Sequence, residues 1–225
     1  MSLSNNTKPE LRLDWCSYKA AKYACEHWHY SGSLPVGKLV KVGVWEDSAF
    51  IGCVLFAWGA NKSLGSPYGL AMTECCELVR IALTNHVSEV SRVTSLAIKF
   101  LKKQSPGLKL IVSFADPSAG HHGGIYQAGN WVYTGPCSPT FEYRLNGQRL
   151  NKRAFTGNQF GKVGSRSSIP SGAVRTTVPG KHRYLYPLIK EMRAKIAPLA
   201  KPYPKHASNK GNLPDQGKGG GAVPT

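Results

Sequence analysis

The chain has 225 residues, of which 41% are hydrophobic, enough for one sizeable domain with extensions. It contains no apolar run of the roughly 18 residues that span a membrane and begins with polar residues, which predicts a soluble, cytoplasmic protein. The net charge of +17 is uneven: residues 143–225 hold 16 Lys and Arg against two acidic residues, and residues 1–142 hold 13 against 10. We expect a polyanionic partner, double-stranded DNA rather than a membrane, because the basic part lacks an amphipathic apolar face.

The first predicted elements are a short strand and a helix. Residues 11–16 are typical of a strand or of the lead-in to a helix, and Ser17 can cap a helix over residues 18–28. The helix ends in His-Trp-His-Tyr before a glycine turn. We expect His29 and Tyr30 to form one wall of a pocket, with aromatic packing under a loop as the alternative.

A hairpin and a capped helix are predicted next. Residues 37–58 are apolar on both sides of a polar Glu-Asp-Ser turn, which is typical of two hairpin strands. The apolar stripe of residues 88–104 predicts a helix that Ser88 can cap. Its first turn also carries Ser91. Free backbone amides and the helix dipole would make this end a site for an anionic donor; the alternative is an ordinary cap.

Arg80 lies inside a further predicted strand, residues 74–84, which is rich in Leu, Val and Ile. Burying an unpaired guanidinium costs several kcal/mol. We therefore expect Arg80 to pair with Glu74 or Glu77, or with the phosphate or carboxylate of a bound donor.

The stretch from Leu108 to Trp131 combines a strand with reactive side chains. Its first eight residues have the length of a buried strand, which Asp116 and the following proline end. A segment rich in small residues follows and carries two histidines and Tyr126. Ligands of open α/β sheets bind beyond the carboxyl ends of strands, so these side chains are candidates for catalysis. The alternative is a tight turn with a solvated aspartate.

The C-terminal half is predicted to add two strands and a basic extension. Residues 131–137 and 141–150 would close the sheet, which makes residues 1–150 one domain. Residues 151–201 would form a basic extension on the domain or on DNA, and residues 202–225 a disordered tail. Tyr184 and Tyr186 would contact nucleic acid or pin this part to the core. The residues expected to bind phosphates are Arg149, Lys152, Arg153, Lys162, Arg166, Arg175, Lys181 and Arg183.

The order of elements resembles the GNAT acyltransferase superfamily, and the sequence more closely resembles the phage-encoded Mom family. The resemblance lies in HWHYSGSLPVG (27–37), ELVRIAL (77–83), SRVTS (91–95) and SFADPSAGHHGGIYQAGNW (113–131). It implies an α/β fold with a GNAT-like central mixed sheet flanked by helices, and a basic C-terminal extension. It also implies a transferase that converts adenine in DNA to N6-carbamoylmethyladenine in the host cytoplasm, which protects phage DNA from restriction.

Carried over by position, the family's functional residues fall on His29, Tyr30, Arg80, Ser91, Asp116 and Tyr126. Asp116 would accept a proton from the amine of a flipped adenine, and Tyr126 would stack on the base or act as an acid. The donor would be held by Arg80, Ser88 and Ser91. The usual GNAT donor loop, Q/R-x-x-G-x-G/A, is missing, because NHVSEVSRV contains no glycine. This leaves either acetyl-CoA or an aminoacyl-tRNA as the activated donor.

Two alternatives remain. The first is an iron enzyme with a two-histidine-one-carboxylate site drawn from Asp116, His121, His122 and His29. The family's link to iron would likewise concern His29, Tyr30 and Asp116. The second is a basic DNA-binding protein without catalytic activity, which would bind DNA in a salt-sensitive way and leave its nucleosides unchanged.

Overall fold

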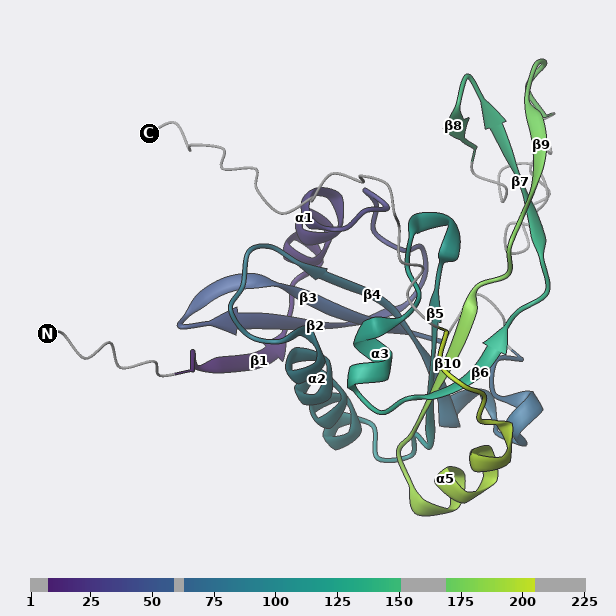
Figure 1. Cartoon of the computed structure of the whole chain (residues 1–225). Coiled ribbons are helices and arrows are strands. Elements are labelled where there is room, and N and C mark those ends of the chain that lie inside the picture. Colours follow the sequence, from purple (N-terminus) through teal and green to yellow (C-terminus); the bar gives the residue numbers. More distant parts are fainter. Residues whose placement is uncertain (1–7, 59–62, 151–168, 205–225) are drawn as a thin grey trace, which may run out of the picture.

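The computed structural model describes residues 8–58, 63–150 and 169–204, which are built around a seven-stranded mixed sheet with the order β1-β2-β3-β4-β5-β10-β6 (Figure 1). All neighbouring strands are antiparallel except β4 and β5, which are parallel. The strands of this sheet are β1 (Leu11–Trp15), β2 (Leu39–Glu46), β3 (Ala49–Ala57), β4 (Cys75–Leu83), β5 (Leu110–Ala115), β6 (Val132–Pro136) and β10 (His182–Pro187).

Helices cover both faces of the sheet. They are α1 (Tyr18–Trp28), α2 (Val90–Gln104), α3 (Gly124–Ala128) and α5 (Lys190–Ile196), with 3₁₀ turns at Ser66–Tyr68, Met72–Glu74, Pro117–Ala119 and Ala197–Leu199. The predicted cap of α1 is confirmed, because the Ser17 hydroxyl accepts a hydrogen bond of 3.1 Å from the amide of Ala20. The hairpin of β2 and β3 is also confirmed, with Asp47 and Ser48 at positive φ in its turn.

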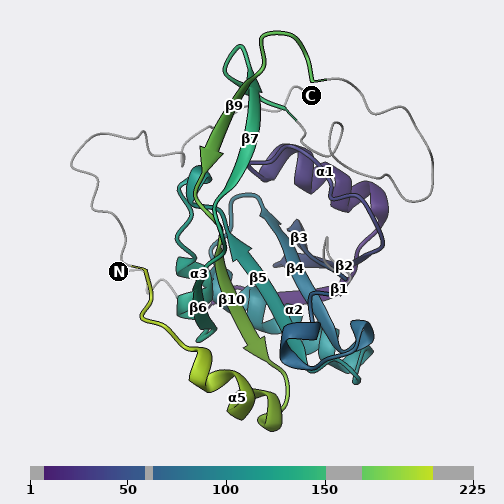
Figure 2. The same cartoon turned by 90° about the vertical axis from the view of Figure 1, so that its right-hand side faces the viewer.

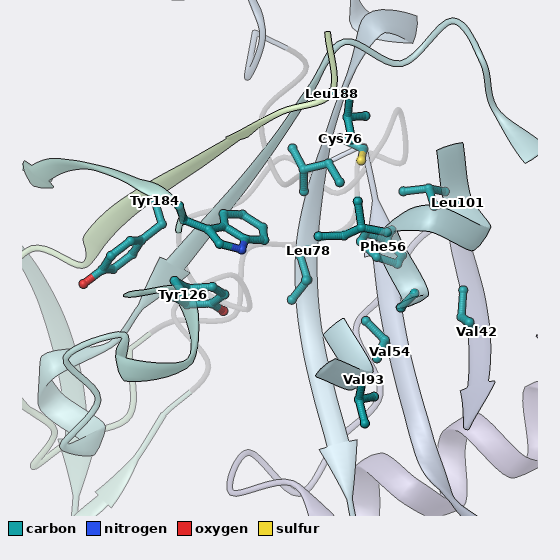
Figure 3. Packing of buried hydrophobic residues seen from close by; sticks show 14 of the residues in the cluster. Val42, Val54, Phe56, Cys76, Leu78, Val93, Leu101, Tyr126, Tyr184 and Leu188 are labelled. Atoms are coloured by element: carbon teal, nitrogen blue, oxygen red, sulfur yellow. The ribbon is translucent and has the colours of Figure 1, made fainter. Parts of the chain in front are cut away.

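The core has two layers because side chains alternate along each strand. On β3, Val54 and Phe56 pack against α2, where they meet Val93 (Figure 3). Cys53 and Leu55 point to the opposite face and pack with the buried alanines of α1. The amphipathic pattern of the sequence thus places α1 and α2 on opposite faces of the sheet.

Pairing between β4 and β5 stops halfway along the two strands. The last paired residues are Leu78 and Ser113, although both strands continue. At the same point β4 has a bulge, because Arg80 pairs with Leu55 of β3 and Leu78 with Phe56, which leaves Val79 as the extra residue. The sheet is therefore interrupted between β4 and β5 at the carboxyl end of β5, where the sequence predicts a site.

The strand that closes the sheet differs from the prediction. Residues 141–150 do not join it; β10 does, between β5 and β6, and buries Tyr184 and Leu185 completely. Helix α5 packs on this strand through Met192 and Ile196. Residues 182–187, which the sequence assigns to the basic extension, thus form a central strand of the main sheet. Tyr184 belongs to the core, not to a nucleic-acid surface.

A second sheet of three antiparallel strands, β7 (Thr140–Leu145), β8 (Gln148–Arg149) and β9 (Val174–Val178), projects from the body (Figures 1 and 2). We call this sheet the arm. It lies between β6 and β10 in the sequence. Residues 151–168 and nearly all of the predicted disordered tail lie outside the described residues.

The mixed sheet with helices on both faces confirms the α/β fold class that the sequence predicts. In the described part of the chain, no helix has the length and apolar character to cross a bilayer.

Candidate active site

Asp116 lies directly after β5, where the pairing with β4 has already ended, and is buried. One carboxylate oxygen accepts a hydrogen bond of 3.0 Å from the amide of Ser118, and the other lies 3.4 Å from the Lys181 ammonium. Lys181 was predicted to bind DNA phosphates. The two contacts hold the carboxylate in a fixed orientation at the end of the strand.

The end of α1 reaches the loop that follows Asp116. The rings of His29 and Tyr30 lie 4.3 Å apart, and the ring of Tyr30 lies 4.7 Å from that of His121. The amide of His121 in turn donates to the carbonyl oxygen of Asp116 over 3.1 Å. Tyr30 is 60% exposed, so its ring is accessible to a ligand. The predicted wall of His29 and Tyr30 and the predicted catalytic carboxylate thus belong to one connected group.

His29 is held as a neutral imidazole. Its Nδ1 accepts a hydrogen bond of 3.1 Å from the amide of Ser31 and lies 2.8 Å from the Ser31 hydroxyl. Burial, reinforced by the charges of Arg80 and His121, lowers the pKa of His29 to about 4. Near neutral pH this side chain therefore carries no positive charge and offers hydrogen bonds rather than an acidic proton.

Tyr126 lies on α3 and reaches the interruption between β4 and β5. Its hydroxyl lies 2.7 Å from that of Ser113, which donates to the carbonyl of Leu78 over 2.8 Å. Burial raises the pKa of Tyr126 to about 12, so the phenol stays protonated. Its ring packs on Trp131 and Tyr184, each 5.0 Å away, as the side-by-side tyrosines of Figure 3 illustrate. The geometry suits a proton donor better than a surface on which a base stacks.

Arg80 lies at the β4 bulge and does not pair with Glu74, one of its two predicted partners. Glu74 pairs with Lys109 over 2.6 Å instead. The Arg80 guanidinium donates to the carbonyl of Val79 over 3.2 Å, while its buried Nε has no hydrogen-bond partner among the described residues. A buried N–H without an acceptor costs about 1–3 kcal/mol. An acceptor atom of a bound molecule could satisfy it.

The N-terminal end of α2 differs from the prediction, because Ser88 does not cap it. The helix begins at Val90, and the N-cap residue Glu89 makes no side-chain capping bond. The amides of Val87 and Ser88 instead donate to the Glu46 carboxylate over 2.9 and 2.8 Å. Burial would raise the pKa of Glu46, but these hydrogen bonds outweigh it and lower the pKa. A carboxylate of the chain itself thus binds the amides just before α2, next to the predicted anion site.

A groove of about 500 Å³ runs along α2 and α3. Its wall includes Ser91, which is predicted to hold the donor, and Ser95, one helical turn further along α2. Arg92 and Asn130 also line the groove and were not predicted from the sequence. Of the two, only Asn130 has a local sequence signal for its backbone conformation, a positive φ of 57°, because it follows a glycine after α3. This groove lies on the α2 face of the sheet, whereas His29 and Tyr30 lie on the α1 face, with Tyr126 between them.

The predicted phosphate-binding residues are scattered. Arg175 is exposed on the arm, and its guanidinium lies 4.0 Å from the ring of Phe141. Arg183 is half-buried in β10, 3.6 Å from the Cys137 sulfur. Arg149 belongs to β8. Outside the described residues lie Lys152, Arg153, Lys162 and Arg166.

The predicted iron ligands do not assemble into a metal site. Within the ranges that the structure describes, no three His, Cys, Asp or Glu side chains come together as a metal ion would require. Asp116 pairs with Lys181, and Nδ1 of His29 is engaged by Ser31. Both side chains are thus engaged by groups of the protein itself.

The chain matches known proteins in sequence over most of its length. A model described as the Mom protein family matches residues 10–205. The methylcarbamoylase Mom of Escherichia phage Mu is 27% identical over 206 residues, which cover 87% of this chain and 84% of the phage Mu protein. A solved structure from Acinetobacter baylyi ADP1, assigned as an acetyltransferase, has a TM-score of 0.44 and 9% identity and covers 83% of this chain and 95% of its own.

Proposed function

Because this chain belongs to the Mom protein family, we propose that it modifies DNA by converting adenine to N6-carbamoylmethyladenine, which protects phage DNA from host restriction. The observation that carries the proposal is the family match over residues 10–205, a range that includes every candidate catalytic residue. The 27% identity to the phage Mu methylcarbamoylase supports the kind of group transferred.

The acceptor amine sets the chemical demands. The N6 lone pair of adenine is delocalised into the ring, and in a duplex the amine is paired, so the base must leave the helix before it reacts. The exposed Tyr30 ring, next to His121, offers an aromatic surface for the extruded base. Neutral His29 beside it supplies hydrogen bonds without adding positive charge near the amine.

Asp116 is the proposed proton acceptor. As the new bond forms at N6, one N6 proton passes to the carboxylate, which Ser118 and Lys181 hold in place. Tyr126, protonated and buried at the interruption of the sheet, can return a proton to the leaving group of the donor. The unsatisfied Nε of Arg80 can bind an acceptor atom of the donor.

The donor is proposed to occupy the groove along α2 and α3, where Ser91 lies. The activated donor is either acetyl-CoA or an aminoacyl-tRNA. Direct transfer from acetyl-CoA would leave an N6-acetyl group, which lacks the nitrogen of the product. A glycyl ester of tRNA has the required atoms, but its direct transfer would leave N6–C(=O)–CH2–NH2, an isomer of the carbamoylmethyl group that must still rearrange. The Glu46 carboxylate repels a phosphate at the end of α2, which disfavours the usual placement of a CoA diphosphate. The large positive charge of the chain suits a nucleic-acid donor as well as a DNA acceptor.

Mass spectrometry of nucleosides tests the proposal. DNA from a bacterial host that expresses the chain should contain deoxyadenosine carrying a carbamoylmethyl group, and DNA from a host that expresses Asp116→Asn should not. Unmodified nucleosides together with strong, salt-sensitive DNA binding would indicate a non-catalytic DNA-binding protein and contradict the proposal.

A further inference from the structure

The arm has the dimensions of an element that enters a DNA groove. The six residues of β7 span about 20 Å at about 3.4 Å per residue. In both views the arm extends away from the body, at the opposite end from α5 (Figures 1 and 2). The major groove of B-DNA, about 12 Å wide, admits a ribbon of two strands. The strands β7 and β9 form such a ribbon, and β8 adds only two residues on the other side of β7.

One face of the arm carries side chains that suit nucleic acid. Cross-strand partners lie on the same face of a sheet, and Phe141 pairs with Thr177 while Tyr143 pairs with Arg175. The guanidinium of Arg175 lies 4.0 Å from the Phe141 ring, whose centre is 5.7 Å from that of Tyr143. This face therefore combines a cation, two aromatic rings and a hydroxyl, which can bind phosphates, base edges and sugar surfaces.

The charge of the arm is complementary to DNA. Its three strands contain Arg144, Arg149 and Arg175 but a single acidic residue, Glu142. Glu142 is buried, and one of its oxygens lies 2.7 Å from Nε of Arg144. The acidic side chain is thus buried and paired with an arginine, whereas Arg175 on β9 is exposed.

The base of the arm is fixed beside the catalytic carboxylate. Gly180 is packed so closely that a Cβ there would lie 1.8 Å from the carbonyl oxygen of Cys137. The amide of Cys137 donates to the carbonyl of Lys181 over 2.8 Å, and the Lys181 ammonium reaches Asp116. Three residues after β9 ends, the chain is in contact with the site, so a duplex bound along the arm runs next to Asp116.

We propose that the arm is a DNA-binding β-ribbon that lies in the major groove next to the target adenine, with Arg175 as its main contact. The proposal rests on the proposed function, since it takes DNA to be the substrate. It assigns to the arm the task of holding the duplex while the adenine turns into the site.

Charge reversal on the arm tests this placement. Fluorescence anisotropy with a labelled duplex should show that Arg175→Glu weakens binding about tenfold or more, because a groove contact is lost. Arg193→Glu in α5 changes the charge equally at the far end of the molecule and should alter the dissociation constant by no more than about twofold to threefold. Equal losses in the two variants would mean general electrostatic attraction and would overturn the proposal.

Groove-specific competitors test the position of the ribbon. Methyl green, which occupies the major groove, should displace the protein from DNA, and netropsin, which occupies the minor groove, should not. Displacement by netropsin alone would refute the major-groove placement.

Failure of this inference is distinguishable from failure of the proposed function. If the wild type modifies adenine and the Arg175→Glu variant binds DNA as tightly as the wild type, the role of the arm is refuted but the proposed function is not. A wild type that binds through Arg175 yet leaves every nucleoside unmodified would refute the proposed function alone. If both hold, Arg175→Glu should raise KM for DNA by a larger factor than it lowers kcat.

Discussion

The ammonium of Lys181 lies 3.4 Å from a carboxylate oxygen of Asp116, and the contact joins two segments that are 65 residues apart in the chain. Lys181 stands at the junction between the arm and β10, and Asp116 at the end of β5. A cation that the sequence predicts for DNA binding is thus a neighbour of the proposed proton acceptor.

Asp116→Asn should abolish most of the modification. The amide keeps the size of the carboxylate but cannot take a proton from N6, and the loss of a general base lowers rates by about 10²–10⁴-fold. The measurement is the rate of carbamoylmethyladenine formation by mass spectrometry, with DNA affinity followed in parallel and expected to stay close to wild type. Asp14→Asn is the control, because Asp14 is exposed on β1, where its carboxylate contacts Arg12 and the amide of Trp15. A normal rate in Asp116→Asn would contradict the assignment.

Substitutions at Lys181 should separate positioning from DNA binding. If Lys181 orients Asp116, Lys181→Ala should lower kcat by about tenfold while KM for DNA changes little, and Lys181→Arg should restore much of the rate because it keeps the cation near the carboxylate. Steady-state kinetics at varied DNA concentration provide both constants. A rise in KM with unchanged kcat would instead identify Lys181 as a phosphate contact.

Stability should fall as the pH drops through the range in which His29 resists protonation. The pKa of His29 is about 4 in the folded protein and about 6.5 in the unfolded chain, so between these values only the unfolded chain takes up the proton. The stabilisation is present above pH about 6.5 and is lost towards pH 4. Urea denaturation at pH 7 and pH 5 should show the decline, and His29→Gln should reduce it. An equal decline in His29→Gln would show that another group is responsible.

Removal of the Glu46 carboxylate should destabilise the fold. Glu46→Ala leaves the amides of Val87 and Ser88 without their acceptor, which should cost about 2–3 kcal/mol in urea denaturation. Glu26→Ala, which removes an exposed ion pair with Lys22 at 3.7 Å, should cost no more than about 0.5 kcal/mol.

Isothermal titration calorimetry of wild-type protein should detect no binding of CoA at the end of α2. CoA binding that appears only in Glu46→Gln would support the carboxylate as a barrier, whereas tight binding to the wild type would contradict it.

Gly180→Ala should disturb the junction of the arm. The new methyl group would meet the Cys137 carbonyl at 1.8 Å, which forces the backbone to shift at a cost of about 1–3 kcal/mol. Gly107→Ala is the matched control, because nothing lies within 4 Å of its Cβ position. Thermal denaturation of both variants gives the comparison. An unchanged Gly180→Ala would show that the junction can relax without cost.

Local patterns in the sequence predicted the elements whose causes are local. Ser17 and the helical spacing after it defined α1, and the Asp-Pro corner placed Asp116 at the end of β5. The resemblance placed His29, Tyr30 and Asp116 in one site, and the ring contacts and the hydrogen bond through His121 join them.

Features that depend on distant contacts could not be read in this way. The carboxylate of Glu46 accepts a hydrogen bond from the amide of Val87, which is 41 residues away in the chain. The local sequence pattern predicted Ser88 as the cap of α2, because it could not indicate this distant contact. The six residues of β10, HRYLYP, combine basic and aromatic side chains, a composition that suits an exposed basic segment as well as a strand. Their place between β5 and β6 is set by burial of Tyr184 against Tyr126 and Tyr133, which only the folded chain shows.

The central position of β10 has a consequence for synthesis on the ribosome. A nascent chain that has emerged only as far as the arm still lacks the strand between β5 and β6, so two hydrogen-bonding edges stay open until residue 187 is free of the exit tunnel. Premature termination within residues 151–181 would release a polypeptide that contains Asp116 and Tyr126 but has no means of completing the sheet around them. Such fragments should aggregate or be degraded, because the sheet is complete only after β10 has emerged.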